Sequence, residues 1–438
     1  MSYLRRKQRL LCFFVIACII LLAGCQNKEK SVDPVTIKIA GMFQADYDNF
    51  YGKYLEEEFP NVTFQIVQYH HDKEESFFDQ LKNTVEQEQP DIVATADLLS
   101  TGKISGMFLS LEPYLKRDKS MLKAVPSSIV ETIRSFSPDN QIYGWSGTFN
   151  ANLLVYNKSL FDRYNVDYPN DNLSWRDLFK LVRSFPTENE QGQPLYGLLV
   201  PGQVEPERRI HSLISQAGTS EKLRLLDTDR HLPTIETDAW KEIWNAAIEA
   251  YQTGAISNMP ALDPNNQVID MPSYEQQYQL FLNGQAAVTL AGTGLLNILS
   301  EQRQIEWGLA SSPGTYINLS LSTWSIPVQS AHSDQAWEVI RFLTSEVMNR
   351  HRSEWDKTFM PVQTQLLDKK YAVPLSLYFT KAASVDEVLQ EIYYPSNASF
   401  YQKYSLLSEE KLKQILEGKL STDQALRELQ QQLAPFAD

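Results

Sequence analysis

Two kinds of hydrophobic spacing alternate along the first part of the chain. Apolar side chains at every second position predict a strand over residues 35–40, and the same spacing recurs over residues 62–66. Apolar residues at helical spacing predict helices over residues 47–55 and 77–85, and a third strand is expected at residues 90–94. This β-α-β-α-β order is typical of a parallel sheet covered by helices, which binds ligands at the carboxyl ends of its strands.

Polar side chains follow two of these strands and are candidates for a binding site. Gln44 comes shortly after the first strand, and Asp97 comes shortly after the third. The carboxyl ends of parallel strands meet at one edge of a sheet, so both side chains are expected at that edge. For Asp97 an equal alternative is a structural role as the N-cap of the following helix.

A second α/β unit begins after residue 152, which gives the two domains that a chain of 438 residues is expected to need. Its strands are predicted at residues 153–156, 196–200, 285–290 and 307–310. Helices are predicted at residues 160–164, 174–182, 240–251, 274–282, 335–348 and 421–433. Gln203 follows the strand that ends at Val200, so it is a third candidate for a binding edge.

An aromatic-rich stretch, residues 140–158, joins the two units. It holds Trp145 among small polar residues, with Asn150 a few positions later. Aromatic faces beside polar side chains suit a ligand that is polar but has apolar faces, such as a sugar. The alternative is a buried aromatic corner between two sheets, because most aromatic residues belong to cores.

The N-terminal segment is predicted to be an export signal outside the fold. Four basic residues precede the apolar residues 10–22, a run too short to span a membrane comfortably. The sequence Leu22-Ala23-Gly24-Cys25 that follows resembles the bacterial lipobox. This resemblance implies cleavage before Cys25 and diacylation of its thiol, and the alternative is an uncleaved signal anchor.

The lipobox divides the N-terminus into two parts. Residues 1–24 are assigned to a lipoprotein signal peptide, and residues 25–33 to a lipidated flexible tether. Two lipid chains on Cys25 are enough for stable membrane anchoring. Cys12 and Cys18 would leave with the signal, so no intramolecular disulfide is expected.

Charge and motifs exclude several classes of function. The net charge is −14, and it becomes −18 without the four basic residues of the signal, so nucleic acid is not an expected partner. No nucleophile elbow or phosphate loop is found. His70-His71-Asp72 is better explained as a solvated turn than as a metal site, because adjacent strand side chains point in opposite directions. We therefore expect no catalytic residue, no metal and no cofactor.

Eight short sequence segments follow one another in a recognisable order. Two examples are LVYNKSLF at residues 154–161 and FLNGQAAV at residues 281–288. The others are residues 90–93, 142–144 (joined with 154–161), 174–178, 307–314, 324–327, 336–345 and 418–421. Behind a lipobox, this order resembles the family 1 extracellular solute-binding proteins of bacterial ABC transporters, which are similar to maltose-binding protein and the sugar-binding lipoproteins.

The resemblance implies an α/β fold of two lobes, each a mainly parallel sheet flanked by helices, with the ligand in the cleft between them. The chain of such proteins crosses between the lobes more than once. The N-terminal lobe is expected at residues 34–148 and 317–355, and the C-terminal lobe at residues 149–316 and 356–438.

The resemblance also directs the choice of cleft residues. Asn150 falls where the family often has a polar residue at the first crossing, and Asp97 falls where an acid often grips sugar hydroxyls. Many members place an aromatic residue at the position of Thr293-Gly294, so here a stacking face would have to come from another residue. The expected ligand-binding residues are Gln44, Asp97, Trp145, Asn150, Gln203 and Trp324.

The expected function is that of a monomeric, non-enzymatic receptor, lipid-anchored on the outer face of the cell membrane of a Gram-positive-type bacterium. It would capture a mono- or oligosaccharide by cleft closure and deliver it to ABC permease subunits. Two alternatives stay open. One is a secreted lipoprotein hydrolase of polysaccharides, which needs a carboxyl pair across the scissile bond. The other is a ligand sensor that docks on a membrane receptor kinase.

Overall fold

The structure, a computed structural model, describes the chain in twelve stretches. These are residues 35–69, 77–95, 106–135, 137, 139–202, 205–258, 273–302, 305–314, 319–355, 360–363, 377 and 398–437. Five sequence predictions lie outside the described residues: the signal peptide, the tether with Cys25, the turn at His70-His71-Asp72, and the candidate site residues Asp97 and Gln203.

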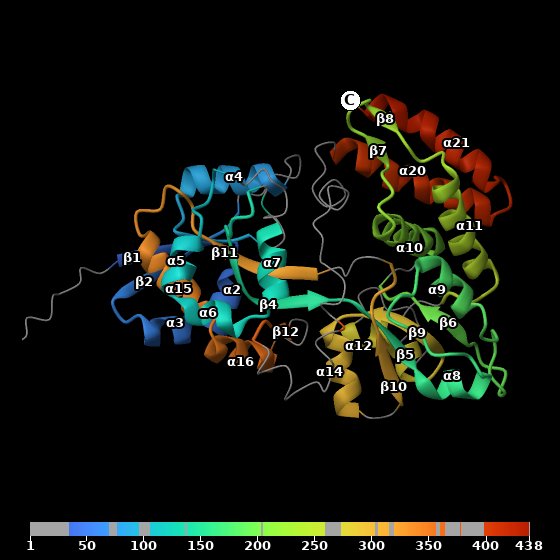
Figure 1. Ribbon diagram of the computed structural model, residues 1–438, viewed down its shortest axis with the longest axis horizontal. Helices are drawn as coiled ribbons and strands as arrows, with labels where there is room; N and C mark the ends of the chain where they lie inside the picture. Colours follow the sequence, from blue (N-terminus) through green and yellow to red (C-terminus); the bar gives the residue numbers. More distant parts are fainter. Residues whose placement is uncertain are drawn as a thin grey trace, which may run out of the picture.

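The first of two lobes is built on a six-stranded sheet in the order β12-β4-β11-β3-β1-β2 (Figure 1). β1 pairs in parallel with β2 and β3, whereas β11 pairs antiparallel with β3 and β4, and β12 pairs antiparallel with β4. The strands are β1 (Val35–Ala40), β2 (Val62–Val67), β3 (Ile92–Ala94), β4 (Trp145–Ala151), β11 (Leu319–Ser325) and β12 (Met360–Pro361).

The second lobe is built on a four-stranded sheet in the order β10-β5-β9-β6. β5 pairs antiparallel with both neighbours, and β6 pairs in parallel with β9. The strands are β5 (Leu153–Asn157), β6 (Tyr196–Leu199), β9 (Ala286–Ala291) and β10 (Trp307–Ala310), with a separate hairpin of β7 (Leu226–Asp227) and β8 (Leu232–Pro233). The expected two-lobe α/β fold is confirmed. Both sheets are mixed rather than mainly parallel, because strands that enter from the other lobe join them in antiparallel pairs.

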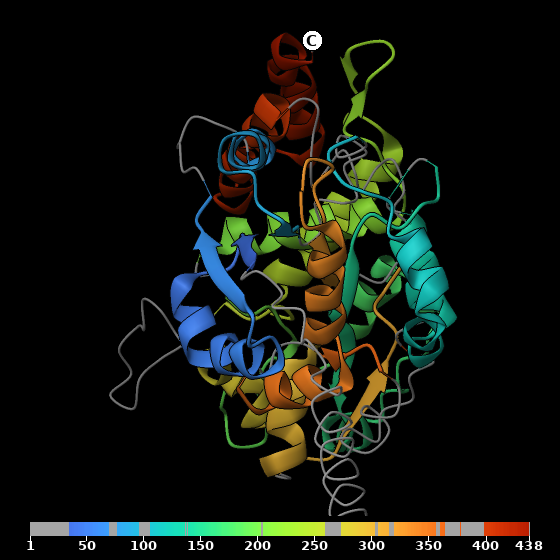
Figure 2. The same cartoon turned by 90° about the vertical axis from the view of Figure 1, so that its left-hand side faces the viewer.

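Helices cover both sheets. The first lobe has α2 (Gln44–Asp46), the π-helix η1 (Tyr47–Tyr51), α3 (Gly52–Glu58), α4 (Phe77–Glu88), α5 (Glu112–Arg117), α6 (Lys119–Ala124), α7 (Ser127–Ser135), α15 (Ser333–Leu343) and α16 (Glu346–Trp355). Seen from the end of this lobe in Figure 2, α15 (orange) runs down the middle of the view, with blue and turquoise helices on either side.

The second lobe has α8 (Lys158–Tyr164), α9 (Trp175–Val182), α10 (Pro206–Ser220), α11 (Asp238–Gln252), α12 (Tyr274–Gln277), α13 (Gln279–Leu282), α14 (Thr293–Gln302), α20 (Ala398–Leu416), α21 (Thr422–Leu433) and the 3₁₀-helix η3 (Ala434–Phe436). Two predicted helix starts are confirmed in detail. The Ser174 side chain accepts a hydrogen bond from the Asp177 N–H at the start of α9, and Ser421 forms a capping box with Gln424 at the start of α21.

Three features differ from the sequence predictions. Part of the aromatic stretch forms a strand, β4, that the sequence did not predict. Almost all residues of β4 are buried, so it lacks the alternation of polar and apolar residues that marks a half-exposed strand. The helix predicted over residues 335–348 is broken after Leu343, where Thr344 caps α15 before α16 begins. β12 pairs with β4, so residues 360–361 lie in the first sheet, whereas the expected boundary placed them in the C-terminal lobe.

One partly buried histidine makes the stability of the second lobe depend on pH. His211 of α10 has the Ser408 hydroxyl 2.7 Å from Nδ1 and the Ser405 hydroxyl 3.3 Å from Nε2, both from α20. Burial lowers the pKa of the imidazole to about 4, from an ordinary value of 6.5. Between these values the unfolded chain binds a proton that the folded chain does not, so the free energy of unfolding falls as the pH falls.

The free energy of unfolding of the wild-type protein should fall between pH 6.5 and pH 4. In the His211→Gln variant we expect this fall to be smaller by about 2 kcal/mol. The measurement is urea unfolding followed by circular dichroism at several pH values. Carboxylates titrate in both proteins, so the difference between them reports His211. The same pH dependence in both proteins would show that His211 is protonated as readily in the folded state as in the unfolded state.

Candidate functional site

The carboxyl ends of strands from both lobes face each other. In the first sheet β3 and β4 both pair antiparallel with β11, so β4 runs in the same direction as β3 and β1. β4 then passes through Asn152 into β5 of the second lobe. The carboxyl ends of β1, β3 and β4 therefore lie on the edge of the first sheet that faces the second lobe.

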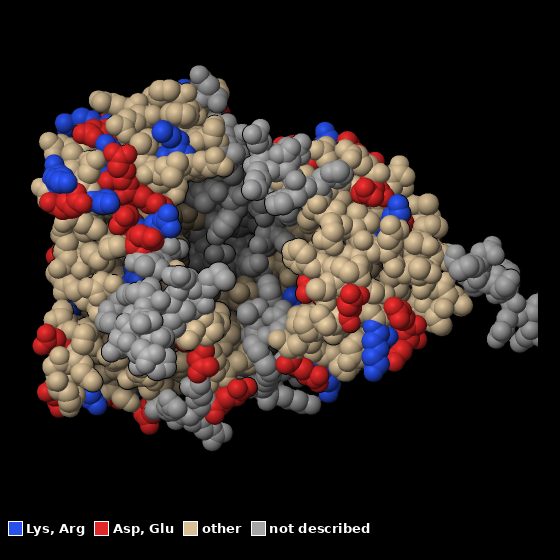
Figure 3. Space-filling model, turned by 180° about the vertical axis from the view of Figure 1, so that it is seen from behind, with Lys and Arg blue, Asp and Glu red and all other residues tan. Residues whose placement is uncertain are grey.

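The second sheet presents the matching edge. β9 ends beside the start of β5, where Ala291 pairs with Leu153, and β6 runs parallel to β9. The turns after β6 and β9 therefore face the first lobe from beside the crossing. Figure 3 shows the surface hollowed between the two lobes. A ligand in this cleft would meet loops that follow strands of both sheets, which is the usual position of a ligand site in open α/β sheets.

Asn150 lies at the crossing itself, one residue before the end of β4. Its Oδ1 accepts a hydrogen bond of 3.4 Å from the Thr293 hydroxyl, at the start of α14 in the second lobe. A Cβ on Gly292 would lie 2.4 Å from the same oxygen, so only glycine allows this close approach. Asn150 therefore joins the first crossing strand to the β9–α14 turn, and its side chain is partly exposed.

Trp145 and Trp324 lie side by side at the level where β3 ends. They are register partners on β4 and β11, and Trp324 also pairs with Ala94, the last residue of β3. Trp145 is 1% exposed and Trp324 is 7% exposed, and both belong to a hydrophobic core that extends from the first lobe into strands of the second. This is the arrangement of a buried aromatic corner, so direct ligand contact by either residue stays a prediction.

The turn after β1 presents an exposed aromatic side chain. Gln44 is exposed and donates to Asp48 Oδ1 over 2.8 Å. Phe43 beside it is 69% exposed, the highest value among the large hydrophobic residues of the described stretches. The sequence pattern pointed to this turn through Gln44, but it gave no reason to prefer Phe43, because its exposure depends on the fold.

An aromatic ring also fills the space above Gly294, at the N-terminus of α14. A Cβ on Gly294 would lie 2.5 Å from Cε1 of Tyr274, which comes from α12. The Tyr274 hydroxyl oxygen accepts hydrogen bonds from the Leu295 N–H and from the Tyr278 hydroxyl, and burial raises the pKa of the phenol. No sequence signal relates these two positions, which lie twenty residues apart.

The end of β3, just before Asp97, is held by a buried cluster of hydroxyl groups. The Thr95 Oγ1 lies 2.9 Å from Thr323 Oγ1 and 3.0 Å from Ser325 Oγ, and all three side chains are buried. The strand that leads toward Asp97 is thus fixed to β11. The structure brings Trp145 and Trp324 together and places Gln44 and Asn150 on the same edge of the first sheet.

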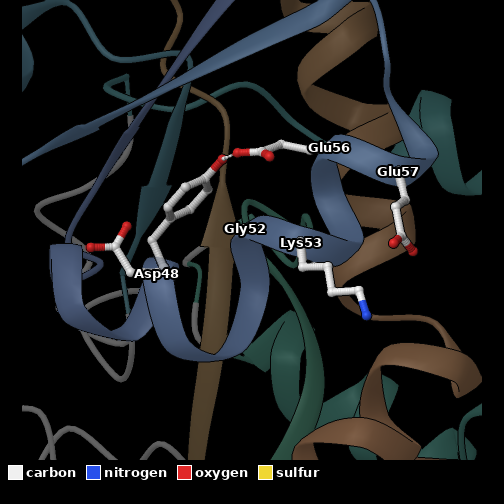
Figure 4. Close-up of a pocket in the computed structure, with 6 residues that line it drawn as sticks. Asp48, Gly52, Lys53, Glu56 and Glu57 are labelled. Atoms are coloured by element: carbon white, nitrogen blue, oxygen red, sulfur yellow. Dashed lines mark hydrogen bonds between the residues drawn. The ribbon is translucent and has the colours of Figure 1, made fainter.

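A shallow pocket is formed by the first lobe alone (Figure 4). It is lined by side chains of η1 and α3, where the Tyr47 hydroxyl donates to Glu56 Oε1 over 3.1 Å. Because one helical segment supplies all of its walls, it cannot draw contacts from both lobes. Its lining residues are Tyr47, Asp48, Gly52, Lys53, Glu56 and Glu57.

Among the described residues, no helix is both long enough and apolar enough to cross a membrane. Within the same part of the chain, no group of three or more His, Cys, Asp or Glu side chains is placed to hold a metal ion.

Solved structures of bacterial binding proteins share this fold along most of their length. The sugar-binding protein MalE from Xanthomonas citri is 17% identical, with a TM-score of 0.61, and the match covers 92% of this chain and 97% of that chain. A sugar transporter protein from Rhizobium etli in an open conformation is 17% identical, with a TM-score of 0.60 and coverage of 91% and 98%. An ABC transporter solute-binding protein from Agrobacterium vitis with bound D-mannitol is 15% identical, with a TM-score of 0.60 and coverage of 92% and 98%.

Identities this low establish the fold alone, and curated protein sequences contain no match to this chain. The family is established by a sequence model instead. The model of the bacterial extracellular solute-binding proteins matches residues 42–349, which is more than half of the chain. This span runs from the turn after β1 to α16 and includes both facing edges of the cleft. The chain therefore belongs to the family of bacterial extracellular solute-binding proteins.

Proposed function

We propose that this protein captures a carbohydrate between its two lobes and delivers it to an ABC permease, and that it acts by binding alone. The observation that carries the proposal is the pair of facing strand-end edges, because a ligand held there contacts both lobes. Such a ligand favours the closed arrangement only through contacts that the open one lacks. Gln44 and Asn150 are polar residues of the first edge, and Trp145 and Trp324 lie behind it. Asp97 and Gln203, which follow β3 and β6 in the sequence, are the other polar residues proposed to bind the ligand.

The choice of a carbohydrate is supported by what similar proteins bind. The Agrobacterium vitis protein holds D-mannitol, and a Listeria monocytogenes ABC substrate-binding protein of the same fold holds cycloalternan. Carbohydrates match the chemistry of the cleft edges, where amide and hydroxyl groups lie beside aromatic rings. Outside the cell the protein would be held at the membrane by lipid on Cys25, at the end of a signal peptide formed by residues 1–24.

A thermal-shift screen tests binding. The panel contains maltose, maltotriose, cellobiose, D-mannitol, ribitol and a hexuronic acid disaccharide. A sugar present at 100 times its dissociation constant is expected to raise the free energy of unfolding by about 2.7 kcal/mol, which appears as a higher melting temperature. Mass spectrometry of the same mixtures should show the sugars unchanged. Cleavage products that depend on one carboxylate of the protein would contradict the proposal and favour a hydrolase.

A further inference from the structure

We propose that the hydrogen bond from the Thr293 hydroxyl to Asn150 holds the two lobes in the open arrangement, and that it breaks when the cleft closes on a ligand. Thr293 is then a positioning residue, which sets the affinity for every ligand without contacting any of them. The inference rests on the proposed function and concerns the regulation of the same cleft. It is carried by the position of this bond, which spans the first crossing between the lobes.

The two ends of the bond are fixed to different lobes. Asn150 is paired with β11, so it belongs to the first sheet. Thr293 lies just after β9, whose last residue, Ala291, pairs with Leu153 at the start of β5. Rotation of one lobe against the other has to bend the short backbone segment between Asn150 and Leu153. Such a bend changes the distance between Asn150 and Thr293.

This contact can lengthen, but it cannot shorten. A Cβ on Gly292 would lie 2.4 Å from Asn150 Oδ1 and 3.3 Å from Asn150 Cγ, so the amide group already rests on the backbone before α14. The bond from Thr293 is 3.4 Å long, so a small further separation breaks it. Rotation in one direction is therefore blocked by the glycine backbone, and rotation in the other direction costs the hydrogen bond.

The bond favours the arrangement in which it is observed. The surface is hollowed between the lobes in this arrangement, as Figure 3 shows. Closure separates the bonded groups, so contacts of the ligand with both lobes have to offset the lost bond. The apparent affinity of a ligand is reduced by the fraction of molecules that can close, and this reduction is the same for every ligand.

Burial separates this role from ligand contact. The Thr293 side chain has no exposed surface and Gly292 is buried, so neither residue touches a ligand held in the cleft. Asn150 is partly exposed, so its amide group is also accessible to a ligand. A substitution of Thr293 therefore tests the bond without removing a ligand contact, whereas a substitution of Asn150 would change both.

Calorimetric titration with maltotriose, cellobiose, D-mannitol and ribitol tests this inference. Thr293→Val replaces the hydroxyl by a methyl group of similar size. It should tighten the binding of each probe that the wild-type protein binds, and by the same factor of roughly 2- to 5-fold. Thr293→Ala should act in the same direction. Thr293→Ser keeps the hydroxyl and should stay within about twofold of the wild-type affinities.

The matched control is Thr289→Val on β9, which removes another hydroxyl without exposed surface from the same lobe. Thr289 donates to the Leu199 carbonyl oxygen over 3.1 Å, so its bond lies within the second lobe and its loss should not tighten binding. Unchanged or weaker binding by both Thr293→Val and Thr293→Ala, factors that differ between the probes, or equal tightening by Thr289→Val would overturn this inference alone. Failure of the wild-type protein to bind any probe would overturn the proposed carbohydrate function and this inference with it.

Discussion

Replacing Trp337 by alanine is expected to lower the free energy of unfolding by about 4 kcal/mol, because it leaves a cavity the size of a buried tryptophan side chain in the first lobe. Trp337 of α15 has no exposed surface. Its ring stacks on Tyr114 with centroids 5.2 Å apart, and its Nε1–H donates to Asp118 Oδ2 over 2.6 Å. The measurement is urea unfolding followed by circular dichroism.

Two phenylalanine variants separate packing from hydrogen bonding. Trp337→Phe keeps an aromatic ring but loses the hydrogen bond to Asp118. Trp244→Phe in the second lobe loses an indole N–H that has no hydrogen-bond partner among the described residues. We expect Trp337→Phe to cost about 1 kcal/mol more than Trp244→Phe. A Trp337→Ala variant as stable as the wild-type protein would show that α15 does not pack against the first lobe as described.

Gly197→Ala is expected to lower the free energy of unfolding by about 3 kcal/mol through a clash with backbone. A Cβ on this residue of β6 would lie 2.0 Å from the Val182 carbonyl oxygen and 2.6 Å from its carbonyl carbon. Val182 ends α9, so the obstacle is a helix end and not a side chain that can turn away. Strand and helix would have to move apart, which opens the core of the second lobe.

Gly308→Ala on β10 of the same sheet is the matched control. There the three atoms nearest to a Cβ would all belong to the side chain of Tyr156, the closest at 2.3 Å. A ring can shift more easily than a helix end, so the loss of stability should be smaller than at Gly197. Thermal unfolding of both variants compares them directly. A larger loss for Gly308→Ala would mean that the contact of β6 with α9 is looser than the structure shows.

Regular spacing of apolar residues made much of the fold predictable. β1, β2 and β3 alternate or form short apolar runs, and capping residues such as Ser421 mark helix starts. The strand β4 was not predicted, because it is buried on both faces where it crosses toward the second lobe and its sequence therefore does not alternate. Mixed pairing could not be predicted either, since the direction of β4 and β11 within the sheet depends on contacts between segments far apart in the chain.

The candidate site was predictable only in outline. The end of a predicted strand identified the turn with Gln44, whereas the family resemblance identified Asn150 at the crossing. The exposure of Phe43 and the position of Tyr274 over Gly294 depend on packing between segments, which spacing does not encode. The burial of Trp145 shows the same limit, since an aromatic residue beside polar ones suits a core as well as a ligand.

Small-angle X-ray scattering with and without a bound sugar tests the central claim most directly, namely that a ligand joins the two facing edges of the cleft. The sugar is the one that stabilises the protein most in the thermal-shift screen. If it contacts both lobes, its binding should draw them together and reduce the radius of gyration and the maximum dimension of the protein. An unchanged scattering profile at saturating sugar would contradict closure of the cleft around the ligand.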